Sequence, residues 1–330
     1  SHTAPISAIC YTNLLTATWF NKHNVGGNSD LKPNYNYWTI FRIAKEQPKK
    51  YKTAIYSSWT NNRTVLIGEG KKETNYLKID YVKDGYDLDS IRFPKKEKDL
   101  HIFDIDEQIS KDAAEGIRTD APDLSWVYLW YTDDAGHIAG NGAFFDEYVR
   151  KADEQVARIW EAVKYREANF DEEWMVVITT DHGRGENGHD HGVSTNVPVN
   201  SHFTSGNLAI TDIAPSICRF MDFEVPQSVL WEQDGMSFVG DADIYDLQTM
   251  PYDNTVGLSW KCYSENVPVT VYVAVTNKFK EGDEDEWIKL VTLPAGKRSY
   301  TVDLQALPES KFYKFVIVAP GNHLNRWLEK

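Results

Sequence analysis

Four side chains that can bind a metal ion gather in a glycine-rich stretch, residues 178–192 (ITTDHGRGENGHDHG). They are Asp181, His182, His189 and His191. Carboxylate and imidazole groups suit zinc or a similar divalent ion. The whole chain holds nine histidines in 330 residues, so a polar surface loop that holds three of them by chance is the less favoured interpretation. The stretch therefore predicts a metal centre.

A second pair of metal-competent side chains, Asp133 and His137, stands in the pattern Asp-x-x-Gly-His. Gly136 is expected to permit a sharp bend that brings both side chains to one point. Two ions roughly 3.5–4 Å apart would stabilise both the attacking and the leaving oxygen of a phosphoryl transfer. The alternative is a helix cap at Asp133 and a surface histidine. Asp134 is expected to lie outside the ligand set.

Strands and helices must position these side chains. The apolar run 175–178 is expected to form a short buried strand that positions Asp181 and His182 at its carboxyl end. Residues 124–131 are expected to form a central strand, and Asp133 follows just after its end. Between them, residues 143–168 carry one apolar stripe, typical of a helix. Strand, helix, strand predicts an α/β fold with a parallel sheet, whose ligands gather at the carboxyl ends of strands. Further elements are expected as helices at 37–44, 103–117 and 211–221, a strand at 51–59 and an irregular segment at 60–100.

The pattern changes after about residue 240. Val269, Val271 and Val273 alternate with polar or small residues, as in a half-buried strand. Further short strands are expected at 287–293, 300–304 and 312–318, without helices, and the acidic run 281–286 is expected to be a solvated hairpin tip. These features predict two domains: a catalytic domain over 1–240 and a β-sandwich over 241–330.

Composition limits the function. The net charge is −14, which disfavours binding to duplex nucleic acid. No apolar run approaches the roughly 20 residues that a transmembrane helix needs. Three widely spaced cysteines suggest no disulfide framework.

Residues 131–140 (YTDDAGHIAG), 179–183 (TTDHG) and 188–192 (GHDHG) resemble motifs of the alkaline phosphatase superfamily, and most closely its type I phosphodiesterase/nucleotide pyrophosphatase branch. The resemblance covers roughly residues 1–240 and implies an alkaline-phosphatase-like, largely parallel sheet flanked by helices. It also implies two zinc ions. One is held by Asp133, His137 and a late histidine, for which His191 is the candidate and His189 the fallback; the other is held by Asp181, His182 and a further Asp. The tail is similar to a fibronectin-type β module.

The resemblance also implies a serine or threonine nucleophile upstream of the turn at Thr16. Ser7 stands nine residues before Thr16, and Asn28, twelve residues after it, matches an Asn that steadies phosphoryl oxygens. The alternative for Ser7 is a helix cap, and Thr3 and Thr12 are the other candidate nucleophiles.

The sequence departs from the family at three places. Ala17 and Asn24 stand where the family has glycine, and no counterpart exists for the first strand with its Asp ligand. Since Ser1 to Pro5 resemble neither an initiator nor a signal peptide, we expect the given sequence to omit upstream residues. A sulfatase is set aside because residues 7–11 lack the Arg of the sulfatase motif.

These observations predict a zinc-dependent phosphodiesterase or nucleotide pyrophosphatase that acts on a small phosphate ester through phospho-Ser7. The alternatives are a phosphomonoesterase or phosphotransferase of the same superfamily, and a catalytically inactive member that binds a glycan or a protein through its C-terminal module. The module and the acidic surface favour an extracytoplasmic location, in the periplasm or at the cell surface.

Overall fold

The computed structural model describes residues 4–185, 191–192 and 208–329. The chain divides into two compact units. The first comprises residues 1–11, 25–33 and 39–198, and the second comprises residues 12–24, 34–38 and 199–330. The division into domains at residue 240 remains a prediction.

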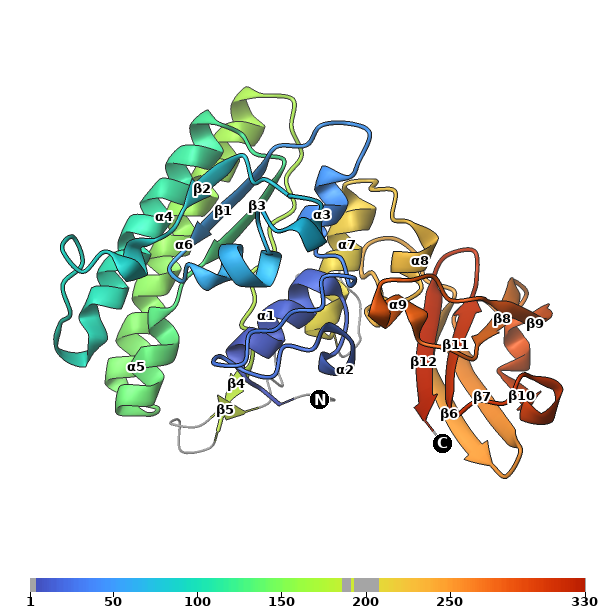
Figure 1. The fold of residues 1–330 in the computed structure, drawn as a ribbon. Helices are drawn as coiled ribbons and strands as arrows, with labels where there is room; N and C mark the ends of the chain where they lie inside the picture. Colours follow the sequence, from blue (N-terminus) through green and yellow to red (C-terminus); the bar gives the residue numbers. More distant parts are fainter. Residues whose placement is uncertain (1–3, 186–190, 193–207, 330) are drawn as a thin grey trace. The chain divides into compact units, whose positions relative to one another are not determined.

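A parallel sheet with the strand order β2-β1-β3 forms the centre of the first unit (Figure 1). The strands are β1 (Thr53–Ser57), β2 (Tyr81–Lys83) and β3 (Leu124–Tyr128). All five residues of β1 are buried, as expected for a central parallel strand covered on both faces. The predicted strand at 51–59 is thus confirmed. A strand also forms within 124–131, but β3 lies at the edge of the described sheet and is mostly half-buried, so it is not the central strand that we expected. The segment that was expected to be irregular contains β2 and several short helical turns.

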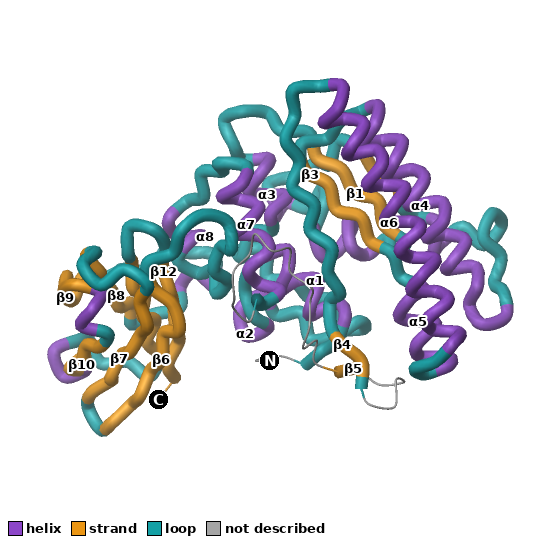
Figure 2. The backbone as a smooth tube through the Cα atoms, turned by 180° about the vertical axis from the view of Figure 1, so that it is seen from behind, coloured by secondary structure: helices purple, strands orange, loops and turns teal. Residues whose placement is uncertain are grey.

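Two long helices, α4 (Leu100–Thr119) and α6 (Ala143–Asn169), run side by side next to this sheet (Figures 1 and 2). Ile105 and Ile109 of α4 are fully buried in one cluster with Tyr56 of β1, and each buried side chain of this size stabilises the fold by about 1.5–3 kcal/mol. Both helices were predicted from their apolar stripes. Together with the parallel sheet they confirm the α/β class.

The apolar run at 175–178 is not the buried strand that we predicted. Residues 173–180 form no strand, and Val176, Val177 and Ile178 are 41%, 38% and 64% exposed. A strand needs a neighbour that satisfies its backbone hydrogen bonds. Among the described strands the edge strand β3 pairs only with β1, so the run joins no ladder. It leads instead to a short hairpin of β4 (Gly183–Arg184) and β5 (His191–Gly192).

Shorter helices complete the chain. They are α1 (Ser7–Thr16), α2 (Phe20–His23), α3 (Ile40–Lys45), α5 (Tyr131–Ala139), α7 (Ile213–Phe220), α8 (Gln227–Leu230) and α9 (Lys278–Glu281). In the part of the chain that the structure describes, no helix combines the length and the apolar character that a membrane crossing requires.

The second unit contains the predicted β module. A three-stranded sheet, β10-β7-β6, and a four-stranded sheet, β12-β11-β8-β9, are both antiparallel and share one apolar core. Val269, Val271 and Val273 are fully buried in it, which confirms the alternation read from the sequence. The strands are β6 (Ile244–Tyr252), β7 (Thr255–Cys262), β8 (Pro268–Ala274), β9 (Ile288–Pro294), β10 (Ser299–Asp303), β11 (Phe312–Val318) and β12 (His323–Glu329).

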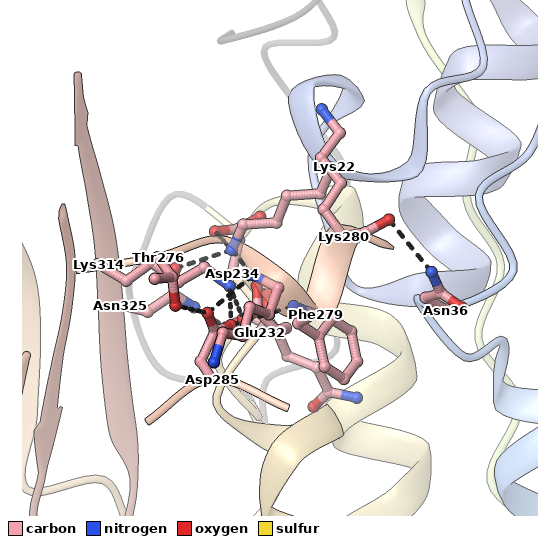
Figure 3. Close-up of polar contacts among 12 residues, drawn as sticks. Lys22, Asn36, Glu232, Asp234, Thr276, Phe279, Lys280, Asp285, Lys314 and Asn325 are labelled. Atoms are coloured by element: carbon pink, nitrogen blue, oxygen red, sulfur yellow. Dashed lines mark hydrogen bonds and ion pairs between the residues drawn. The ribbon is translucent and has the colours of Figure 1, made fainter. Parts of the chain in front are cut away.

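The acidic run 281–286 lies in the connection between the paired strands β8 and β9, and five of its six residues are exposed, as predicted for a solvated hairpin tip. Asp285 is the exception, because its side chain is 2% exposed. The ammonium group of Lys314 binds Asp285 at 2.7 Å and also the buried carboxylate of Glu232 (Figure 3). A buried carboxylate requires such a partner, and the sequence pattern around residue 285 does not reveal a lysine that lies 29 positions away.

Candidate active site

Ser7 is the first residue of α1 and is 8% exposed. Its Oγ lies 3.1 Å from Nε2 of His182, which comes from the loop after the 175–178 run. The other ring nitrogen of His182, Nδ1, lies 2.9 Å from the carbonyl oxygen of Gly183. Because a carbonyl only accepts, Nδ1 donates this hydrogen bond, and in the tautomer with its hydrogen on Nδ1 the Nε2 atom accepts from the Ser7 hydroxyl.

Asn28 lies next to the start of α1. Its Oδ1 accepts a hydrogen bond of 2.9 Å from the backbone N–H of Ala8, in the first turn of the helix, where the backbone N–H groups have no carbonyl of the preceding turn to bond. The bond places the Asn28 amide one residue from Ser7. The two predicted catalytic residues therefore lie together.

Asp181 lies beside the same histidine. Its Oδ2 is 3.3 Å from Nε2 of His182, but this buried oxygen accepts no hydrogen bond from the described residues. A buried carboxylate oxygen without a donor carries a high desolvation cost. A bound cation would remove that cost, so Asp181 and His182 fit one of the two predicted metal sites.

Tyr11 was missed by the sequence analysis. It lies one helical turn after Ser7, and its hydroxyl donates a hydrogen bond of 2.8 Å to the Tyr128 hydroxyl. Burial raises the pKa of Tyr11 well above its usual value, and the negative charges of Asp181 and Asp133 raise it further. The Tyr11 hydroxyl is therefore close enough to both predicted metal-binding carboxylates for their charges to raise its pKa. A helix predicted from Ser7 onward would have revealed it, because positions four apart share a helix face.

Asp133 and His137 meet on one face of α5, with Asp133 Oδ2 3.3 Å from His137 Nε2. The predicted sharp bend at Gly136 is wrong, because residues 131–139 are helical. The spacing of four brings the two side chains together through the helical period instead.

Gly136 instead leaves space for the side chain of Arg184. A Cβ on Gly136 would lie 2.0 Å from Cζ of Arg184, so only glycine leaves room for the guanidinium against the helix. Nη1 of Arg184 lies 3.2 Å from Oδ1 of Asp133. In the sequence, Arg184 stands out only as a basic residue within the metal-competent stretch 178–192.

The two pairs, Asp133 with His137 and Asp181 with His182, are separate, and within the described residues no three His, Cys, Asp or Glu side chains are close enough to hold an ion. The predicted third ligands lie elsewhere. His189 lies outside the described residues, and so does the alternative nucleophile Thr3. For His191 the structure gives the backbone, which pairs with Arg184 in the β4–β5 hairpin.

A family model for type I phosphodiesterase / nucleotide pyrophosphatase matches residues 1–222. No curated protein matches the chain.

Solved structures match over short stretches. Pectate lyase Pel3 from Pectobacterium carotovorum is 25% identical over 26% of this chain and 25% of its own, with a TM-score of 0.19. The spore cortex lytic enzyme SleM from Clostridium perfringens is 18% identical over 26% and 27%, with a TM-score of 0.19. Superoxide reductase from Giardia intestinalis is 13% identical over 27% and 100%, with a TM-score of 0.20. The match thus spans about a quarter of the pectate lyase, and TM-scores this low support no argument about fold or function.

Proposed function

The chain belongs to the type I phosphodiesterase/nucleotide pyrophosphatase family of the alkaline phosphatase superfamily, and we propose that it hydrolyses a small phosphate ester through two zinc ions and a covalent phosphoserine at Ser7. The observation that carries the proposal is the 3.1 Å contact between Ser7 Oγ and His182 Nε2. It joins a serine at a helix start to a motif 175 residues later, and both lie in the segment that the family model matches.

Ser7 and Asn28 have separate roles in the proposed reaction. Ser7 Oγ attacks phosphorus and forms a new P–O bond. The bond to the leaving group breaks, the leaving oxygen keeps the bonding electrons, and the proton of the serine hydroxyl passes to solvent water. Water then cleaves phospho-Ser7 and restores the serine. Asn28, held by the Ala8 N–H, stabilises the transferred oxygens through its amide nitrogen.

Asp181 and His182 would hold one ion, and Asp133, His137 and His191 the other. When bound, the ions would supply positive charge that lowers the pKa of the serine hydroxyl and stabilises the phosphoryl oxygens. The buried Oδ2 of Asp181, which accepts no hydrogen bond from the part of the chain that the structure describes, supports this assignment.

The two departures at glycine positions do not favour an inactive protein. Ala17 has φ = 58° and Asn24 has φ = 67°, which is the left-handed conformation that glycine adopts freely. The backbone thus keeps the conformation that a glycine would take, at a cost of about 1–2 kcal/mol for Ala17. Asn24 tolerates this region better, because a short polar side chain can bond locally.

The test compares an aryl phosphodiester, an aryl phosphomonoester and an aryl sulfate as substrates. We expect turnover of the diester that is lost on chelation and restored by zinc. Ser7→Ala and Asp181→Ala should abolish turnover while the fold survives, and peptide mass spectrometry should find phosphate on Ser7. Thr12→Ala is the matched control, because Thr12 lies on the same helix and is 1% exposed.

The other outcomes separate the alternatives. Full activity in Ser7→Ala with loss in Thr12→Ala would move the nucleophile to Thr12. A faster reaction with the monoester would indicate a phosphomonoesterase. Metal-free protein without turnover of any ester would favour the binding module, and retained turnover in Asp181→Ala would refute the metal assignment.

A further inference from the structure

Asp106 lies in the middle of α4 and is 2% exposed, yet both of its carboxylate oxygens accept hydrogen bonds. The Ser58 hydroxyl donates to Oδ1 at 2.5 Å. The backbone N–H of Trp130 donates to both oxygens at 3.0 Å, and the N–H of Tyr131 donates to Oδ2 at 2.7 Å. The mechanism proposed above does not use this buried acid.

The bonds of Asp106 join three places of the fold. Ser58 directly follows β1, while Trp130 follows β3 and precedes the first residue of α5. Within the described residues, the Trp130 side chain makes no capping bond to α5. Asp106 therefore supplies the cap of α5 from another helix. Burial raises the pKa of Asp106 to about 7, and the ionised carboxylate places a negative charge at the positive end of the α5 dipole.

The end of α5 that Asp106 caps lies close to the predicted metal ligands Asp133 and His137. Asp133 follows Tyr131 by two residues, and a helix rises about 1.5 Å per residue, so Asp133 lies within one turn of the capped end. His137 follows one turn later on the same face. A rotation or shift of α5 would displace both ligand atoms together.

We infer that Asp106 is a positioning residue, which fixes α5 at the carboxyl ends of β1 and β3 so that Asp133 and His137 meet a divalent cation in the right geometry. The inference rests on the proposed metal-dependent function. Groups that orient metal ligands from outside typically change metal affinity by 10–100-fold when mutated. An acid that served only the stability of α4 would not change this affinity.

The test uses zinc as the probe and Asp106→Asn as the variant. An amide has one acceptor oxygen where Asp106 uses two, and it carries no charge toward α5. Zinc affinity is measured by competition with a chelator, unfolding free energy by denaturant, and exchange of the Trp130 and Tyr131 amides by NMR. We expect zinc to bind 10–100-fold more weakly to Asp106→Asn, with faster exchange at both amides.

Asp112→Asn is the control. Asp112 lies on the same helix and accepts hydrogen bonds from Tyr86 and Gln108, and among the described residues it bonds no residue of α5. It should leave zinc affinity and the two amides unchanged. If Asp106→Asn fails to fold, Ser58→Ala removes a single bond to the same carboxylate and should weaken zinc binding several-fold.

Two results overturn the inference in different ways. If the wild type binds zinc and Asp106→Asn binds it equally well, or if Asp112→Asn loses as much affinity, Asp106 does not position the ligands and the proposed function survives. If the wild type binds no divalent cation, the proposed function fails and this inference fails with it.

Discussion

Gly136→Ala tests the contact between Arg184 and α5. The new Cβ would lie 2.0 Å from Cζ of Arg184 and 2.4 Å from Nη1 and Nη2, so the guanidinium must move. The obstacle is the end of a flexible side chain, and the cost is therefore the lost bond to Asp133 and not a backbone clash. The Arg184 and Asp133 side chains are 16% and 31% exposed. A charge-assisted bond in this partly solvated setting contributes about 1–2 kcal/mol.

Alanine also has a favourable effect, since it is about 1 kcal/mol better than glycine in a helix interior. In the wild-type background the substitution should therefore destabilise the fold by about 0–1 kcal/mol. In an Arg184→Ala background the side chain at position 136 meets no guanidinium, and the same substitution should stabilise the fold by about 1 kcal/mol. The coupling energy of the cycle should be about 1–2 kcal/mol.

The assay is denaturant unfolding of the wild type, both single variants and the double variant. An identical effect of Gly136→Ala in both backgrounds would refute the contact between the Arg184 guanidinium and the helix at Gly136. A stabilisation of about 1 kcal/mol in the wild-type background would do the same, because it would show that the guanidinium makes no contact with the helix.

Three other measurements probe the two units. Lys314→Met leaves buried carboxylates without their partner and should lower the unfolding free energy by about 3–5 kcal/mol. The control Lys278→Met breaks an exposed pair and should lower it by less than about 1 kcal/mol. Equal losses would show that the ion pairs of Lys314 are solvated. Burial lowers the pKa of His23 to about 3, so as the pH falls His23 takes up a proton in the unfolded chain before it does in the folded protein. The unfolding free energy should therefore fall as the pH drops from about 6.5 toward 3, by at most about 1.4 kcal/mol per pH unit. His23→Gln should flatten this dependence, and an unchanged profile would count against a neutral buried His23. Ile178→Thr should change the unfolding free energy by less than about 0.5 kcal/mol because Ile178 is 64% exposed. A loss above about 2 kcal/mol, typical of a core site, would instead support the buried strand predicted at 175–178.

The sequence predicted those features that depend on local patterns. The helices around Ile105 and over 143–168, and the alternating strand at Val269, have periods that match one buried face, and the structure confirms them. The spacing of Asp133 and His137 also suffices to bring them together, although through a helix and not through the bend expected at Gly136. Motifs of this kind carry their chemistry within a few residues.

Tertiary structure decided what depends on a distant partner. The 175–178 run has the composition of a strand, but its burial required a neighbouring strand, and Ile178 lies exposed. No local pattern shows that His182 meets Ser7, or that Asp106 caps α5, because each contact joins segments that are far apart in the chain. Periodicity reports which face of an element is apolar, while the carboxylates, imidazoles and hydroxyls that meet at one point are chosen by the packing of the elements that carry them.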